Sequence, residues 1–244
     1  MFTNLLVNTS KTETRKAELL NLYRNLYCNG GCRSFIECAE SINMKCHDNW
    51  DTFDWSARVG INYDLTIDGV DVRILIIGKE AKELKNQLND PSQWWPGIKR
   101  HYQVTYNTLK QLFNYYPADD SNNHILSMYA LTNVYSCAFR SKPDQTTGIK
   151  NSPIQKNNCL LIRKKEIEIL EPTVILIQYD YLNALDLFDD AVVCCNKVFY
   201  SPKQNCHIIE SSHPCCRRHP WRQDLNESIN YIKANGIIPD LKEI

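Results

Sequence analysis

The chain consists of short apolar runs separated by amphipathic stretches and clusters of turn residues. The clearest run is Ile74-Leu75-Ile76-Ile77, which leads directly into Gly78-Lys79-Glu80. A continuous aliphatic run of this length is typical of a central parallel strand that is covered on both faces. We therefore predict a strand over residues 73–81, with a glycine turn that presents the carboxylate of Glu80 at its carboxyl end.

The remaining apolar segments predict a sheet whose strands alternate with helices. We predict further strands over residues 62–67, 124–134, 173–178, 197–200 and 207–210, and a turn at 68–69 that leads into the central strand. Helical spacing predicts helices over residues 11–27, 104–116 and 181–188, one opened by Cys159, and a final helix capped by Gly236. This alternation indicates an α/β fold with a parallel sheet covered on both faces.

Length, charge and cysteine content narrow the class of protein. The 244 residues suit one α/β domain, and the formal net charge of +0 means that any DNA-binding surface would have to be local. The sequence contains no run long enough to span a membrane and no secretory signal, so we expect a cytoplasmic, reducing location. There, 11 cysteines suggest metal or cluster ligation, or buried thiols, more than disulfides.

Three polar residues follow apolar strands directly. Glu80, Asn133 and His213 each stand at the predicted carboxyl end of a strand, and these ends would meet at one edge of a parallel sheet. There, a carboxylate can orient water, an amide can form hydrogen bonds with the polar edge of a ligand, and an imidazole can stabilise a developing anion. Singly, each residue also has a structural explanation, such as a helix cap for Asn133 or a core position for His213.

These motifs resemble those of the uracil-DNA glycosylase superfamily over roughly residues 28–235. Members have a Gly-x-Asp-Pro or Gly-Glu-Ala-Pro-Gly motif after the first core strand, an Asn at the end of a later strand, and a His-Pro-Ser near the C-terminus. This chain has Gly78-Lys79-Glu80, Thr132-Asn133-Val134 and His213-Pro214-Cys215 in the same order. The resemblance implies a single domain over residues 1–244, a three-layer α/β/α sandwich with a central, mostly parallel sheet. An N-terminal helix and Cys-rich segment, about residues 11–47, would pack on it.

The resemblance also implies an activity, the hydrolysis of the N-glycosidic bond of a flipped-out uracil or C5-modified pyrimidine, which leaves an abasic site. Glu80 would orient or activate water and His213 would stabilise the departing base. Gly78 and Asn133 would contact the base. The sequence does not decide which aromatic residue stacks on the base; the candidates are Trp94, Trp95, His101 and Tyr102.

The chain departs from the family pattern at three positions. Ala81 replaces the proline after the acidic residue, and Cys215 replaces the last serine. Lys82 stands where uracil-specific members keep a tyrosine that blocks a C5 substituent. A pocket without that aromatic side chain would accept larger bases, such as hydroxymethylated or further decorated pyrimidines.

The cysteines resemble those of the iron–sulfur branch of this superfamily. Cys28 and Cys32 stand for its N-terminal pair, although the gap is three residues here instead of two, and Cys137 stands four positions after the motif asparagine. Cys159 would open the next helix. Four thiolates suit a [4Fe–4S] cluster and, equally, a structural Zn²⁺. Cys38 could replace Cys28 or Cys32, and plain buried thiols are the remaining alternative.

DNA contact is expected from local basic residues. Arg217 and Arg218 lie in a run at residues 216–222 that, by the resemblance, enters the minor groove, and Arg140 could hold a phosphate. The alternative is that these are solvated surface charges. The expected partner of a monomeric protein is single- or double-stranded DNA with a modified or deaminated pyrimidine.

Two alternative functions stay open at this point. One is a phage-defence glycosylase that removes hypermodified bases such as glucosylated hydroxymethylcytosine. The other is a non-catalytic, cluster-containing nucleic-acid-binding protein, against which the joint presence of Glu80, Asn133 and His213 speaks.

Overall fold

The structure is a computed structural model of the whole chain. It describes residues 4–28, 31–41, 57–80, 100–116, 124–136, 152–212 and 220–241, and every structural statement below refers to these residues.

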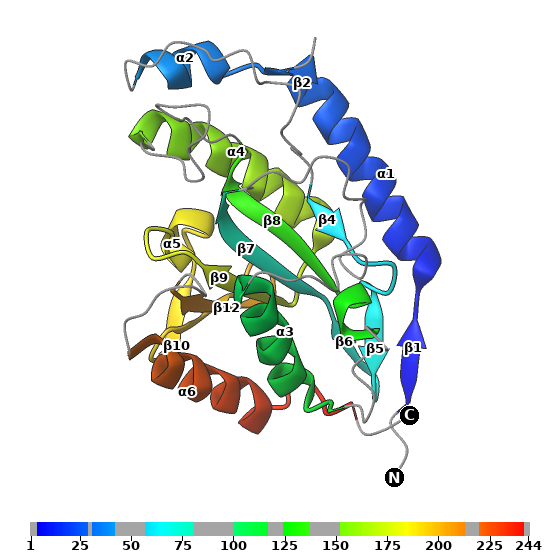
Figure 1. Cartoon of the computed structure of the whole chain (residues 1–244). Coiled ribbons are helices and arrows are strands. Elements are labelled where there is room, and N and C mark those ends of the chain that lie inside the picture. The colour runs from blue at the N-terminus through cyan, green and yellow to red at the C-terminus, as the bar shows by residue number, and fades with distance from the viewer. Residues whose placement is uncertain are drawn as a thin grey trace.

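A seven-stranded mixed sheet forms the centre of the fold (Figure 1). Its strands in spatial order are β10 (Val192–Cys195), β11 (Val198–Ser201), β12 (Cys206–Ser211), β9 (Val174–Gln178), β7 (Ile74–Glu80), β8 (Tyr129–Tyr135) and β4 (Arg58–Val59). The four strands β12, β9, β7 and β8 pair in parallel, whereas β10, β11 and β4 pair antiparallel with their neighbours. The prediction of a parallel α/β core is therefore confirmed for the central strands. The flank β10–β11–β12 is antiparallel because its connections are short turns, which cannot make a parallel crossover.

Helices cover both faces of this sheet. They are α1 (Thr9–Leu26), α3 (Arg100–Phe113), α4 (Pro153–Leu170), α5 (Ala184–Leu187) and α6 (Pro220–Ala234), whereas α2 (Phe35–Glu40) packs against α4. Alternate residues of β7 enter different cores: Leu75 and Ile77 pack in the core with α1, α4 and α5, and Ile74 and Ile76 in the core with α3 and α6. All four are fully buried, which explains the continuous apolar run in the sequence.

Two small antiparallel sheets accompany the large one. One contains β1 (Leu5–Val7), β5 (Leu65–Ile67) and β6 (Val70–Val72), and the other contains β2 (Tyr27–Cys28) and β3 (Gly31–Cys32). Asp68 and Gly69, both at positive φ, make the tight turn of the β5–β6 hairpin. The predicted turn at residues 68–69 is confirmed; it leads to the central strand through the short strand β6, and only Arg73 separates β6 from β7.

Several predicted elements begin at different residues, and two of them bear on the site. The apolar stretch 124–134 starts with the 3-10 helix η3 (His124–Ser127) and only then becomes β8, because an apolar run alone does not distinguish a helical turn from a strand. Helix α4 begins at Pro153, where the Ser152 hydroxyl caps it by accepting from the Gln155 N–H at 3.0 Å. Cys159 therefore lies in the second turn of the helix and does not open it.

A buried ion-pair network anchors α1 to the rest of the fold. The Arg15 guanidinium, 5% exposed, bonds Asp64 at 3.1 Å, Glu171 at 2.7 Å and the carbonyl of Ile169. Glu171 has a φ of 45° at the end of α4, and Pro172 follows and prevents the helix from continuing. This network lies at the end of α4 that is remote in sequence from Cys159.

No helix within the described ranges combines the length and the apolar composition that a membrane crossing requires.

Candidate active site

The carboxyl ends of the four parallel strands meet at one edge of the sheet. The register of β7 with β8 sets Gly78 beside Asn133 and Glu80 beside Tyr135. Ser211 at the end of β12 lies beside Gln178 at the end of β9. His213 is two residues beyond Ser211 and lies outside the described residues. The motifs of Glu80 and Asn133 therefore lie on neighbouring strands, and β12, which precedes the His213 motif, ends at the same edge of the sheet.

Gly78 and Asn133 are in close contact at this edge. A Cβ atom on Gly78 would lie 2.7 Å from Asn133 Oδ1, which is closer than real Cβ contacts. The Asn133 side chain therefore occupies the space that a larger residue at position 78 would need, and Gly78 is required for this close approach. Strand β7 continues through Gly78 to Glu80, so the predicted glycine turn before Glu80 is wrong: the ladder with β8 keeps this segment extended. The structure describes the backbone of Glu80 but not its side chain.

A buried arginine from α4 holds the end of β8. Arg163 is 2% exposed, and its guanidinium donates to the Thr132 hydroxyl at 2.7 Å, the carbonyl of Asn133 and the Ser136 hydroxyl at 3.2 Å. It also pairs with Glu166 at 2.9 Å. The backbone of the candidate base-reading residue is thus fixed from the α4 face of the sheet.

Glu166 completes this network as a fully buried carboxylate. It accepts hydrogen bonds from the Thr132 hydroxyl at 2.8 Å and from the Tyr23 hydroxyl at 2.5 Å, and Tyr23 in turn accepts from the Ala57 N–H at 2.7 Å. Burial raises the pKa of the Glu166 carboxyl, while Arg163 and the two hydroxyl donors oppose this shift. Burial, with the neighbouring Glu166, raises the pKa of Tyr23 well above its usual value, so Tyr23 remains a donor.

Arg163 and Glu166 are site residues that the sequence motifs do not predict. The available signal was a charged pair, three positions apart, on a helix face whose other buried members include Cys159, Ile162 and Ile167. Because charges are rarely buried without partners, such a pair on an apolar face indicates a polar network beneath it.

Three cysteines are near enough to one another for their thiols to interact electrostatically. Cys32 comes from β3, Cys38 from α2 and Cys159 from α4, and Cys38 and Cys159 are buried. Burial raises the pKa of the Cys38 thiol, and the neighbouring thiols of Cys159 and Cys32 raise it further. Burial likewise raises the pKa of the Cys32 thiol. Asn158 joins α4 to α2 through Glu37 at 3.0 Å and Cys38 Sγ at 3.6 Å.

The remaining predicted ligands are only partly visible. The backbone of Cys28 pairs with Gly31 in the β2–β3 hairpin, but its side chain is not described. Cys137 lies one residue beyond Ser136 and outside the described residues. Within the described part of the chain, no group of three or more potential ligands is arranged to hold a metal ion. The donor chemistry of the three gathered thiols nonetheless fits a thiolate-ligated metal or cluster.

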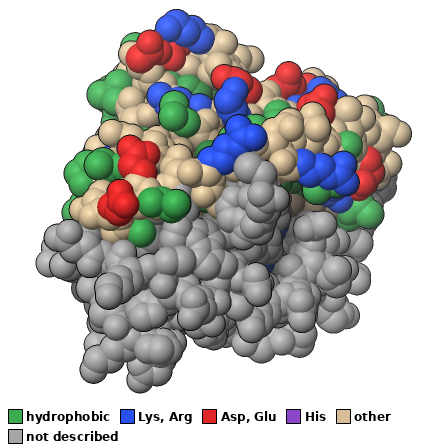
Figure 2. Space-filling view, turned by 90° about the horizontal axis from the view of Figure 1, so that it is seen from above, with side chains coloured by type: hydrophobic (Ala, Val, Ile, Leu, Met, Phe, Trp, Pro, Cys, Tyr) green, Lys and Arg blue, Asp and Glu red, His purple; other side chains and the backbone are tan. Residues whose placement is uncertain are grey.

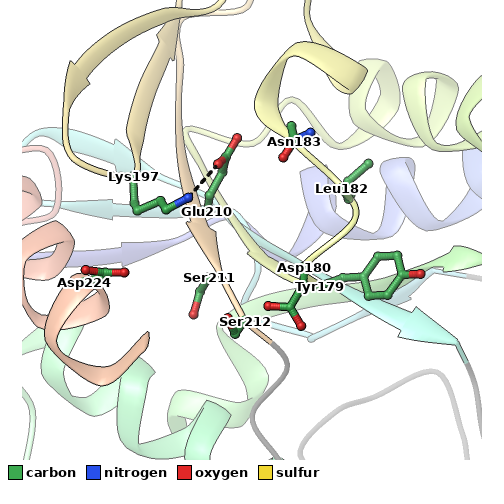
Figure 3. A pocket seen from close by; sticks show the side chains of 9 residues that line it. All are labelled: Tyr179, Asp180, Leu182, Asn183, Lys197, Glu210, Ser211, Ser212 and Asp224. Atoms are coloured by element: carbon green, nitrogen blue, oxygen red, sulfur yellow. Dashed lines mark ion pairs between the residues drawn. The ribbon is translucent and has the colours of Figure 1, made fainter. Parts of the chain in front are cut away.

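A small polar pocket opens next to the ends of β9 and β12 (Figure 3). Its volume is about 80 Å³, which is room for several water molecules. The Lys197 ammonium points to Glu210 at 3.7 Å, while Asp180 and Asp224 add two further carboxylates. This surplus of negative charge suits hydroxyl or amino donors and disfavours phosphate. The pocket is lined by Tyr179, Asp180, Leu182, Asn183, Lys197, Glu210, Ser211, Ser212 and Asp224.

Several predicted site residues fall where the structure says nothing of their side chains. His101 belongs to α3, and only its backbone is described. The others lie outside the described residues; they are Lys82, Trp95, Arg140, Arg217 and Arg218. On the face that Figure 2 shows, the Lys and Arg side chains of the described residues lie among Asp and Glu side chains. This mixture agrees with the net charge of zero and offers no single-sign DNA-binding patch within the described residues of that view.

The chain matches no known protein-family model and no curated protein.

Proposed function

We propose that this chain is a monofunctional DNA glycosylase of the uracil-DNA glycosylase superfamily, with the sandwich fold and iron–sulfur site of one of its branches. The observation that carries this proposal is the register of β7 with β8, which brings Gly78 and Asn133 together, two positions before Glu80. A second support is the end of β12 at the same edge, because His213 follows it by two residues.

The proposed reaction needs only water and the side chains of this edge. The oxygen of a water molecule bonds to C1′ of the flipped-out nucleotide as the bond from C1′ to the base breaks. The Glu80 carboxylate orients this water, takes its proton and favours the cationic sugar of the transition state. The electron pair of the broken bond leaves with the base, whose negative charge His213 stabilises by a hydrogen bond. Asn133 binds the polar edge of the base and so selects it.

The proposed substrate is uracil or a pyrimidine enlarged at C5. The larger bases are included because Lys82 stands where a blocking tyrosine is expected. A phage-defence enzyme acting on glucosylated hydroxymethylcytosine is a variant of the same proposal. Phosphate contacts by Arg217, Arg218 and Arg140 would hold the DNA while the nucleotide is flipped.

A cysteine-bound [4Fe–4S] cluster, or alternatively a structural Zn²⁺, belongs to this proposal. Cys32 and Cys159 would be ligands, together with Cys137 and either Cys28 or Cys38. Bound there, the group would cross-link β3, α2 and α4 and so support the fold.

An assay for abasic sites tests the proposed activity. Purified protein is incubated with oligonucleotides that contain uracil, hydroxymethyluracil or glucosylated hydroxymethylcytosine, as single strands and as duplexes. The matched control oligonucleotides contain unmodified thymine or cytosine at the same position. We expect alkali-sensitive cleavage at the modified position only. If the protein binds DNA but cleaves none of these substrates, the non-catalytic binding protein becomes the better interpretation.

A further inference from the structure

The buried pair Arg163–Glu166 lies directly beneath the end of β8. The two side chains are 2% and 0% exposed and are separated by 2.9 Å. Burying two charges costs free energy unless their remaining hydrogen-bonding groups are also satisfied. Here a large share of those groups is satisfied by one short segment, residues 132–136, which contains the Asn133 motif.

The contacts of Arg163 follow the strand end residue by residue. One terminal nitrogen reaches the Thr132 hydroxyl and the Asn133 carbonyl, and the other reaches the Ser136 hydroxyl. A guanidinium is planar, so its donors keep fixed directions relative to one another. Together these bonds define both the distance of the strand end from α4 and the direction of the Asn133 backbone.

The same helix also carries one of the gathered cysteines. Cys159 precedes Arg163 by four residues, so both lie on one face of α4. The positive charge of Arg163 is close enough to Cys32 to lower the pKa of that thiol, against the larger raising effect of burial. Ser136, whose hydroxyl accepts a hydrogen bond from Arg163, is followed directly in the sequence by Cys137. Arg163 therefore contacts the strand end that carries Asn133 from the same helix that carries Cys159.

We propose that Arg163, held by Glu166, is a positioning residue that fixes Asn133 for base selection and joins it to the cysteine-bearing helix. The base-reading part rests on the proposed glycosylase function; the fixing of the strand end does not. Arg163 itself touches no substrate, and its effect is transmitted through the backbone of residues 132–136.

The test compares two matched lysine variants. Arg163→Lys keeps the charge and removes the guanidinium fork beneath Asn133. Arg15→Lys likewise keeps the charge and removes the guanidinium, but in the separate buried network in which Arg15 pairs with Asp64 and Glu171. For each variant, hydrogen exchange is measured on peptides over residues 129–136 and 62–67. The ratio of kcat/KM for the best base to kcat/KM for the next best is measured on the same samples.

We expect Arg163→Lys to speed hydrogen exchange over residues 129–136. It should also lower the discrimination ratio about tenfold, because the Asn133 amide is no longer held in hydrogen-bonding geometry with the edge of the base. Arg15→Lys should speed exchange over residues 62–67 and leave the discrimination ratio unchanged. Equal exchange at 129–136 in the two variants, or equal discrimination, overturns the proposal.

Two provisions keep this test decisive. If Arg163→Lys does not fold, Ser136→Ala removes a single one of its contacts and should give a smaller change in the same direction; no change in exchange at 129–136 then contradicts the proposal. If the wild-type protein excises no base, the proposed function fails, and the exchange measurement alone decides whether Arg163 fixes the strand end.

Discussion

At the scale of single residues, the packing at the end of β7 depends on Gly78 having no side chain. Gly78 has no Cβ, and the Asn133 side chain lies in the space left open. Gly60 is a stricter case in the same fold, because a Cβ there would lie 2.1 Å from the backbone oxygen of Ser127. The neighbour of Gly78 is a side-chain end that can move, whereas the neighbour of Gly60 is backbone that cannot.

Gly78→Ala should therefore impair base selection more than stability. The added methyl group pushes Asn133 Oδ1 from a position 2.7 Å away. We expect the free energy of unfolding to fall by roughly 1 kcal/mol, within the range of common single substitutions, and the preference among bases to weaken. Denaturant unfolding and the discrimination ratio measure the two effects. Gly60→Ala is the control for a backbone clash and should lower stability much more; the reverse order would contradict this account.

The proposed catalytic side chains should be separable from DNA binding. Glu80→Gln keeps the shape but removes the negative charge, and His213→Ala removes the donor to the departing base. His213→Ala should lower the excision rate by ~10²–10³, as at other preorganised donor sites, and Glu80→Gln should lower it because the cationic sugar loses its counter-charge. DNA affinity should stay nearly unchanged because phosphate contacts dominate it. Single-turnover rates and binding titrations on the same duplex check this, and a rate within a few-fold of wild type would exclude the residue from the chemistry.

At the scale of elements, α4 connects three parts of the molecule. Its buried face packs on the central strands, Arg163 and Glu166 hold β8, and Cys159 and Asn158 face the segment that contains Cys32 and Cys38. Helix α2 is short, and its hydrogen bonds to α4 run through Asn158 and between Ser41 at its own C-cap and Ser152 at the N-cap of α4. A metal bound by cysteines from both would replace this limited packing with strong cross-links.

Substitution of the cysteines should reveal the ligand set. Anaerobically purified protein should contain about four iron and four sulfide per chain if the site is [4Fe–4S]. Cys32→Ala, Cys38→Ala and Cys159→Ala should each lower the metal content and the melting temperature. Cys206→Ala is the control, because that thiol is fully buried in β12 and should affect packing but not metal. If Cys38→Ala keeps its full metal content, Cys38 is not a ligand and Cys28 becomes the candidate for the fourth ligand.

Strand β12 also carries a pH-dependent contribution to stability. His207 is half-buried, and the centroid of its ring lies 4.8 Å from that of Tyr200. Burial lowers the pKa of His207 below the usual 6.5. Above pH 6.5 the imidazole is neutral in both the folded and the unfolded state. As the pH falls through 6.5 the unfolded state takes up the proton first, so stability is lost until the folded pKa is reached.

His207→Gln removes this contribution. Its free energy of unfolding should fall less steeply than that of wild type between about pH 7 and pH 5. Parallel slopes in urea titrations over this interval would show that His207 does not contribute. His207 is chosen because it is remote from the proposed chemistry, so the comparison reports on folding alone.

At the scale of the whole molecule, the parallel centre of the sheet collects distant segments at one edge. Residues 78 and 133 are neighbours, and residues 178 and 211 are neighbours, because parallel strands align their carboxyl ends. The charge of the molecule is balanced overall, so the proposed attraction to DNA would have to arise from a local group of basic residues.

The DNA contact should depend on the run that contains Arg217 and Arg218. Changing both residues to Ala should weaken binding to all duplexes alike and reduce the slope of log affinity against log salt by about one per lost phosphate contact. Binding titrations at several salt concentrations measure this slope. Lys203→Ala is a suitable control, because Lys203 is exposed on the β11–β12 turn and pairs with Asp189. A slope like that of the control would place the DNA contact elsewhere.

The sequence alone was sufficient for the main elements. The run at residues 74–77 predicted β7, residues 173–178 predicted β9, and helical spacing predicted α1, α3 and α6 within a few residues. These elements follow from local periodicity, which is set by which faces are buried. The order of motifs also allowed the candidate residues Gly78, Asn133 and Cys159 to be named before any contact between elements was known.

Only the tertiary structure decided how these elements combine. The antiparallel flank, the β5–β6 hairpin and the start of β8 at Tyr129 depend on pairing partners that are distant in sequence. The same is true of the Arg163 network and of the closeness of Cys38 to Cys159, since the partners of a buried charge or thiol are chosen by packing and not by neighbouring residues. Periodicity reports that a position is buried, but the group it faces is determined by the fold.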